Sequence, residues 1–557
     1  MRIYDPRLGK FLSVDPNIKE SPYYSPYLFA SNSPLQYVDF EGRFLRAGGW
    51  GEIVLTLTFM FAAYQFRNLF ELVFEVLAVL LEEFRDGAAC GALDFDAVLQ
   101  RVAAAALKPG GREWVIGSAF GAPALTVIEA EGVTARKRLD AVSNGRPIIL
   151  EHVSGHGGFA NTLALERAGV NATTPNPADG EIVKAANGEP TGLLRETAAW
   201  LVQRAIPRLS RNDMIEVARA AIAMFNGAGI TAFSDASAGL DAMEVFRALD
   251  DAGGLSCWAG FTMALSPTCA GYNADAAAAM LARRDELCGP HMNAPAAKIF
   301  LDGVPSLRTA AMLQPYALRN ASDAPSDGGA MSRTLDELVD EMAGFDKLGL
   351  SVKVHAVGDR AVRTVLDAVE QVRRRNGADG PQHHIAHGQF ITEQDIPRLT
   401  ALNVLADLCP PLWFPSAASN AHQRVAGAER YAKTWPIKSI LAAGADAAAG
   451  SDWLTVFHDI DPWQALAGML TRKDPSGIFA GVHNADEAIS LEQALPLFTR
   501  NSARAMRIGD KTGQLAPGLS ADAIVLDRDL FTIKPDEIAA TKVEATLFEG
   551  RVVHGAL

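Results

Sequence analysis

Short apolar segments alternate with longer segments of helical spacing along most of the chain. The segments that predict strands span 146–153, 229–236, 255–264, 297–303, 350–358, 384–390, 402–409 and 445–452. Helical spacing of apolar residues occupies most of the intervals between them, at 213–226, 335–347, 360–375 and 436–443. This alternation predicts parallel strands joined by crossover helices, and a long series of such units is typical of a (β/α)8 barrel. We therefore expect an α/β fold of the TIM-barrel type.

Both ends of the chain have a different pattern. After residue 503 the segments 522–531 and 542–555 are strand-like and separated by turn formers, which predicts a small antiparallel β unit over 519–555. The most apolar stretch, 53–66, has 14 residues between Glu52 and Arg67, which is too short to span a bilayer. The next apolar segment, 69–84, carries charges that would be costly in lipid. We expect a buried strand and helix here and no membrane segment.

Composition narrows the class of protein. The chain has 557 residues, of which 49% are hydrophobic and 21% charged, so wholesale disorder is excluded. A net charge of −14 argues against a nucleic-acid or anionic-membrane partner. The five cysteines form no CxxC pair, and residues 1–15 contain no apolar signal segment. These features predict a cytoplasmic protein without a disulfide framework.

Candidate metal ligands lie at the carboxyl ends of predicted strands. His355, His387 and Asp452 end three of them, and Lys298 lies inside a fourth. In a parallel barrel such residues converge on one face, and two imidazoles with a carboxylate suit Zn²⁺. Lysine can join the set only as a carbamate formed with CO₂, because an ammonium has no lone pair. Each residue alone fits a structural role, but their joint placement favours a metal site.

Three other motifs give weaker evidence for a functional site. His152 and His156 have the four-residue spacing of zincins, but the glycines between and after them argue against a helix there. The segment GSAFG at 117–121 is not a GxSxG nucleophile elbow. Arg308 and Thr309 follow a predicted strand, where they could bind polar substrate groups or cap the loop.

From about residue 95 to 557 the chain resembles the amidohydrolase superfamily, in particular its YtcJ-like branch, amidohydrolase family 3, which includes N-substituted formamide deformylases. The motifs that carry the resemblance are GH at 155–156, NTLAL at 161–165, GEPTG at 188–192, GIT at 229–231, KIFLDG at 298–303, HAVGD at 355–359, AHGQ at 386–389, GSDW at 450–453, NSA at 501–503 and GQLAPG at 513–518 with AD at 521–522. The resemblance implies a TIM-like barrel with a small β-domain. It also implies metal-dependent hydrolysis of non-peptide C–N bonds in a small amide-like substrate.

The resemblance also implies roles for metal-binding residues. Lys298 would be a carbamylated bridging ligand, and His355 and His387 would hold the second metal. Asp452 would contact the first metal and act as the general base.

Four further residues are expected near the substrate. The resemblance places His156 beside it, and makes Glu196 and Asp359 candidates for supporting polar contacts. Arg308 joins them from its position after the predicted strand.

One departure from the family pattern changes the number of metal ions and the activity that we expect. The family opens its barrel with a strand ending in His-x-His, which holds the first metal, and this chain has no His-x-His and no histidine before residue 152. By the family pattern 146–153 is an insertion, so seven barrel strands remain and the first is missing or replaced. The segment 52–60 is the nearby run fit to replace it. We therefore expect one divalent metal, zinc, a doubtful second site and impaired activity.

The N-terminal residues resemble the end of an Rhs repeat-associated core domain. YDPRLG at 4–9, FLSVDP at 11–16 and the segment from PY at 26–27 to NSP at 32–34 carry this resemblance. We expect an Rhs-like remnant at 1–43, an unmatched apolar segment at 44–94, the barrel at 95–515 and part of the small β-domain at 516–557. Alternatives are an Rhs-type polymorphic effector, a non-catalytic binding module, or an artefactual fusion of two reading frames. Homo-oligomerisation stays open.

Overall fold

The computed structural model describes residues 93–107, 113–152, 154, 156–207, 210–269, 272–317, 328–453 and 460–557, together with the backbone of 4–5, 10–11 and 53–55. The short strands β1 (Tyr4–Asp5) and β2 (Lys10–Phe11) pair in antiparallel fashion. The expected helix at 69–84 and the rest of the Rhs-like segment lie outside the described residues. Among the residues described, no helix is both long and apolar enough to cross a bilayer.

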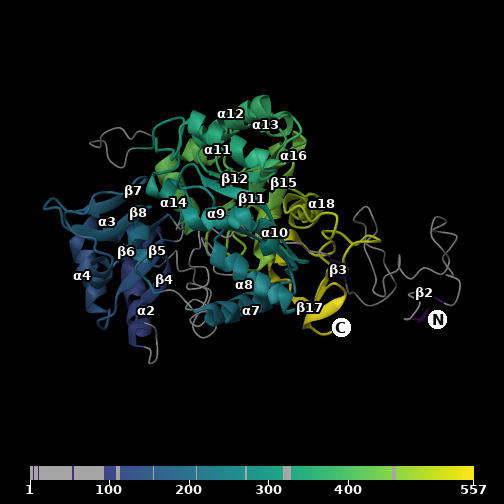
Figure 1. Ribbon diagram of the computed structural model, residues 1–557, viewed down its shortest axis with the longest axis horizontal. Helices are drawn as coiled ribbons and strands as arrows, with labels where there is room; N and C mark the ends of the chain where they lie inside the picture. Colours follow the sequence, from purple (N-terminus) through teal and green to yellow (C-terminus); the bar gives the residue numbers. More distant parts are fainter. Residues whose placement is uncertain are drawn as a thin grey trace.

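A curled, parallel seven-stranded sheet forms the centre of the molecule (Figure 1). Its strands are β9 (Ala232–Ala238), β10 (Trp258–Met263), β11 (Met292–Phe300), β12 (Ser351–Ala356), β13 (His383–His387), β14 (Val404–Leu408) and β15 (Ala447–Ala449). Each pairs with the next strand along the chain. This confirms the predicted parallel order, and within the described residues the sheet has the seven strands that were expected. Because both faces of such a sheet are covered, its strands contain long buried apolar runs.

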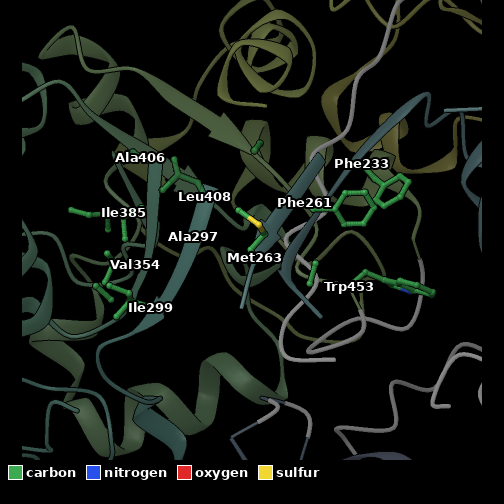
Figure 2. Close-up of a cluster of buried hydrophobic side chains, with 14 of the residues drawn as sticks. Phe233, Phe261, Met263, Ala297, Ile299, Val354, Ile385, Ala406, Leu408 and Trp453 are labelled. Atoms are coloured by element: carbon green, nitrogen blue, oxygen red, sulfur yellow. The ribbon is translucent and has the colours of Figure 1, made fainter. Parts of the chain in front are cut away.

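Helices complete the crossovers and cover the outer face of the sheet. They include α7 (Arg211–Gly227), α8 (Leu240–Asp251), α11 (Leu335–Lys347) and α12 (Asp359–Asn376). The face of the sheet toward the helices carries Ile299, Val354, Ile385 and Ala406, which are register partners on four neighbouring strands and are fully buried (Figure 2). Since side chains alternate along a strand, the residues between them face the barrel interior.

A second sheet, with strand order β4-β5-β6-β8-β7, precedes the barrel. Its strands are β4 (Val115–Phe120), β5 (Ile148–His152), β6 (Gly157–Ala160), β7 (Gly180–Lys184) and β8 (Pro190–Glu196). Helices α2 (Phe95–Leu107), α3 (Ala122–Glu131) and α4 (Val133–Ala141) accompany it. Phe95, Phe120 and Phe159 form its own core through edge-to-face ring contacts. The strand Ile148–His152, predicted within 146–153, therefore belongs to an insertion and not to the barrel sheet.

The C-terminal strands form the expected small antiparallel sheet, in the order β18-β17-β16-β3. These are β16 (Ala523–Leu526), β17 (Val543–Phe548), β18 (Arg551–Gly555) and β3 (Ile53–Leu55). The expectation that 52–60 replaces the missing barrel strand is wrong for Ile53–Leu55, which pairs with β16 instead. β16 is paired on both sides, with β17 and with Ile53–Leu55, whose backbone occupies the edge that β17 leaves open.

Candidate metal centre

Lys298 and His355 reach the barrel interior from adjacent strands. Phe300 is the register partner of His355, and Lys298 shares its face two residues earlier on β11. The Lys298 Nζ atom lies 4.4 Å from the centroid of the Phe300 ring, and that ring lies 5.5 Å from the His355 ring. Both candidate ligands are buried, as expected from their positions on the strands.

His387 reaches the same interior by a change in backbone direction. Its register partner is Ala356, so regular alternation would place its side chain on the face opposite His355. His387 instead has a φ of 71°, and its ring centroid lies 4.7 Å from that of His355. Asp452 has a φ of 52°, also in the left-handed region. Such conformations are costly for residues with a Cβ and often occur at functional sites.

Asp452 and Cys409 lie on one side of His387. The His387 Nδ1 atom is 3.9 Å from Asp452 Oδ2 and 3.4 Å from Cys409 Sγ. One ligand atom from each of the three residues lies within 4.8 Å of the others, and all three side chains are buried. An imidazole, a thiol and a carboxylate are donors that suit a divalent ion such as zinc. The residues present therefore fit a metal.

Cys409 is a member of this group that the sequence analysis did not identify. It follows β14 directly and is two residues after Asp407, so strand alternation puts both on the interior face. The two-residue spacing from Asp407 and the position at the carboxyl end of a strand are the sequence features that could have identified Cys409.

Burial sets the protonation of the candidate ligands. It lowers the pKa of His355 to about 3 and that of His387 well below its ordinary value, with His355 and Lys298 contributing to the second shift. Both imidazoles are therefore neutral and able to donate a lone pair. Burial, with help from nearby Lys353, lowers the pKa of Lys298 to about 8. Burial raises the pKa of the Cys409 thiol well above its ordinary value.

The insertion sheet brings His156 and Glu196 to the same centre. The backbone N–H of Glu196 donates to the His156 carbonyl where β6 pairs with β8, and His156 Nδ1 lies 2.7 Å from Glu196 Oε2. The His156 ring centroid lies 4.9 Å from that of His355. Two residues far apart in the sequence thus meet near the candidate ligands, and their expected contacts with a substrate stay predictions.

Arg308 and Asp359 make contacts with a neighbouring loop. Asp359 Oδ1 accepts hydrogen bonds from the backbone N–H groups of Leu313 and Arg360. The Arg308 guanidinium lies over the Tyr316 ring and donates to the Ala317 carbonyl. These contacts involve the part of the loop after β11 that the structure describes, and the expected substrate contacts of the two residues stay predictions.

Asp302 ties together the ends of β11 and β12. Its carboxylate accepts hydrogen bonds from the backbone N–H groups of Ala311, Val357 and Gly358. Next to it, His355 Nε2 lies 3.1 Å from the Gly303 carbonyl. In the tautomer that donates there, the His355 lone pair is on Nδ1. Burial raises the pKa of Asp302 to about 7. The strand ends that carry the candidate ligands are thus held in a defined position.

An ion pair lies below this centre in the barrel interior. Lys353 Nζ is 2.6 Å from Asp407 Oδ2, and both side chains are 1% exposed. Although burial favours the neutral acid, Lys353 and His384 hold the pKa of Asp407 well below its usual range.

Replacing one partner of this pair should destabilise the protein strongly. We expect Lys353→Met to lower the free energy of unfolding by about 3–5 kcal/mol, because it leaves a buried carboxylate without its counter-charge. The double variant Lys353→Met/Asp407→Leu should recover most of this loss, as measured by urea unfolding. Lys433→Met, at an exposed ion pair, is the control and should change stability by about 0.5 kcal/mol or less. Equal losses in the single and double variants would contradict the prediction.

Comparisons with known proteins agree with this architecture. The family model described as "Amidohydrolase family" matches residues 80–554. The chain is 28% identical over 470 residues to the YtcJ protein of Bacillus subtilis (strain 168), covering 82% of this chain and 83% of that protein. It is also 28% identical over 466 residues to the N-substituted formamide deformylase of Arthrobacter pascens, covering 80% of this chain and 79% of that enzyme.

Solved structures show the same fold. Two are uncharacterized metal-dependent hydrolases, from Pyrococcus furiosus and Pyrococcus horikoshii OT3, each 22% identical to this chain. Their TM-scores are 0.60 and 0.62; the matches cover 86% and 87% of this chain and 88% of each of those chains. Together, the match of the family model over most of the chain and the curled parallel sheet establish that this protein belongs to the amidohydrolase family.

Proposed function

We propose that this chain hydrolyses non-peptide C–N bonds in small amide or formamide substrates, using one divalent ion, zinc, bound around His387. The observation that carries the proposal is the convergence of His355, His387, Asp452 and His156 in one buried place, from three barrel strand ends and the insertion. Membership of the amidohydrolase family supports a hydrolase. The relative named as a deformylase supports the substrate class.

His355, His387 and Asp452 are the proposed ligands, with Lys298 as a fourth in carbamate form. The lowered pKa of Lys298, about 8, leaves a share of its amine neutral at neutral pH. That amine can attack CO₂ and lose a proton, which gives a carbamate with carboxylate-like oxygens. A divalent ion at this place would polarise the substrate carbonyl and favour ionisation of water.

The remaining steps belong to side chains of the chain itself. Asp452 takes a proton from the attacking water and returns it to the nitrogen of the leaving amine. Glu196 holds the His156 ring through the 2.7 Å contact, so that the imidazole is oriented toward the substrate. Burial of His156 and Asp452 limits the access of bulk water and strengthens these polar interactions.

The missing His-x-His motif limits the expected rate. Without these ligands a second ion would have only the carbamate and Asp452, so we propose one ion per chain. A single ion gives the attacking oxygen less charge stabilisation than a two-metal site does. Activity should accordingly be lower than that of a relative with the complete motif.

A hydrolysis assay tests this function. Purified chain, stripped with a chelator and reloaded with zinc, should release the amine from N-benzylformamide and related formamides, and should leave a blocked dipeptide uncleaved. Added bicarbonate should raise the rate, and Lys298→Ala should remove that response; Lys542→Ala, in the small β-domain, is the matched control. Amine release that is unaffected by the chelator, or cleavage confined to the dipeptide, would overturn the proposal.

A further inference from the structure

The thiol of Cys409 has a different environment from the other buried cysteines. Cys257 lies within the main apolar core, and Cys269 donates from its sulfur to the Lys298 carbonyl. Cys409 instead places its sulfur 3.4 Å from a ring nitrogen of His387 and within 4.8 Å of an Asp452 carboxylate oxygen. Packing in an apolar core does not explain why the Cys409 sulfur lies beside two candidate metal ligands.

We propose that Cys409 is a direct metal ligand, so that the single ion is held by His387 Nδ1, Cys409 Sγ and an Asp452 carboxylate oxygen, in place of the His355 and Lys298 donors considered above. The inference deepens the proposed function, on which it rests for the presence of a divalent ion at this site. Within the described residues, it replaces part of the donor set that His-x-His supplies elsewhere in the family.

The distances match those of a tetrahedral zinc site. With Zn–N near 2.0–2.1 Å and Zn–S near 2.3 Å, neighbouring N and S ligands are about 3.6 Å apart, and N and O ligands about 3.4 Å. The measured separations from His387 Nδ1 are 3.4 Å to Cys409 Sγ and 3.9 Å to Asp452 Oδ2. The three ligand atoms lie within 4.8 Å of one another. Because the same ring nitrogen faces both partners, one ion can contact all three after shifts of about 1 Å that bring the sulfur and the carboxylate oxygen closer together.

The backbone positions Cys409 for this role. It follows the last residue of β14 and precedes the short helix η4 (Pro410–Leu412), whose two prolines limit the freedom of the chain. The residue is 1% exposed, so its sulfur is held inside the barrel mouth. His387 and Asp452 are turned toward it by their left-handed backbone conformations.

The donor chemistry predicts which metals bind and what else they require. A thiolate and a carboxylate together balance the charge of a divalent ion, and a thiolate favours zinc, cobalt or cadmium over magnesium. Three protein ligands leave one position open for water or substrate. Because this set does not include Lys298, the ion should bind without bicarbonate.

Cobalt substitution tests the ligand directly. The full chain loaded with Co²⁺ in bicarbonate-free buffer should show a near-ultraviolet thiolate-to-cobalt charge-transfer band along with visible d–d bands. Cys409→Ser should lose the charge-transfer band, whereas Cys269→Ser, which changes another buried thiol near the centre, should keep it. If Cys409→Ser does not fold, cadmium-113 NMR of the wild-type chain gives the same answer through the downfield shift that one thiolate ligand causes.

The outcomes separate this inference from the proposed function. A band that depends on Cys409 supports the inference, even if no formamide is hydrolysed. Bound cobalt without a charge-transfer band, together with metal-dependent hydrolysis, overturns the inference and leaves the function standing. Absence of bound cobalt under every condition overturns both.

Discussion

Replacing His387 with alanine should remove both metal binding and turnover. The His387 Nδ1 atom lies opposite Asp452 and Cys409, and the ring packs against His355, so every donor set considered above includes this imidazole. In the set with Cys409, two protein donors then remain, which hold a divalent ion poorly because catalytic zinc sites ordinarily keep three. Metal content after dialysis should fall to background, and amine release should fall with it.

Because residue 387 has a left-handed backbone conformation, a second variant is needed to separate loss of the ligand from loss of the fold. Alanine at a φ of 71° adds strain, whereas asparagine tolerates the left-handed region better. His387→Asn should therefore keep the fold, as judged by circular dichroism, and still lose the metal. His554→Ala, at an exposed histidine, is the control and should keep both metal and turnover. Unchanged metal content in either His387 variant would refute the assignment.

Asp452→Asn should reduce turnover by about 10²–10⁴-fold, the range expected for loss of a general base. The amide oxygen can still contact an ion, so metal content should fall less than in His387→Ala. Asparagine also accepts the φ of 52° at this position, which limits the structural cost.

The pH profile separates this role from a structural one. An amide has no proton to take or return, so the rate of Asp452→Asn should stay low at every pH at which the protein is folded. Asp285→Asn, at a fully exposed side chain, should leave turnover unchanged. A loss below tenfold in Asp452→Asn would show that another group takes the proton.

Much of the barrel and part of its centre could be predicted from the residues alone. The order of β11, β12 and β13 followed from the alternation of apolar runs and helical spacing. The interior placement of Lys298 and His355 followed from their positions near strand ends. Both are local properties, because a period of two sets the face of a strand residue whatever the rest of the fold does.

Other features depended on segments that are distant in the sequence. His156 meets Glu196 because β6 pairs with β8, a pairing with no local signature. Ile53–Leu55 joins β16 because an open edge accepts an extended segment regardless of its side chains. The residues of this short segment do not indicate whether it pairs with the small C-terminal sheet or with the barrel sheet.

The amino-acid sequence by itself determined the parallel seven-stranded barrel, the small C-terminal sheet and the faces of the residues within regular strands. Only the tertiary structure decided that His387 turns inward against strand alternation and meets Cys409 and Asp452. Beyond the last regular residue of a strand, side-chain direction depends on backbone dihedrals that long-range packing selects. The candidate metal ligands lie at such positions, where the distances between their donor atoms depend on those dihedrals. The periodicity of the sequence therefore could not predict which residues form the metal centre.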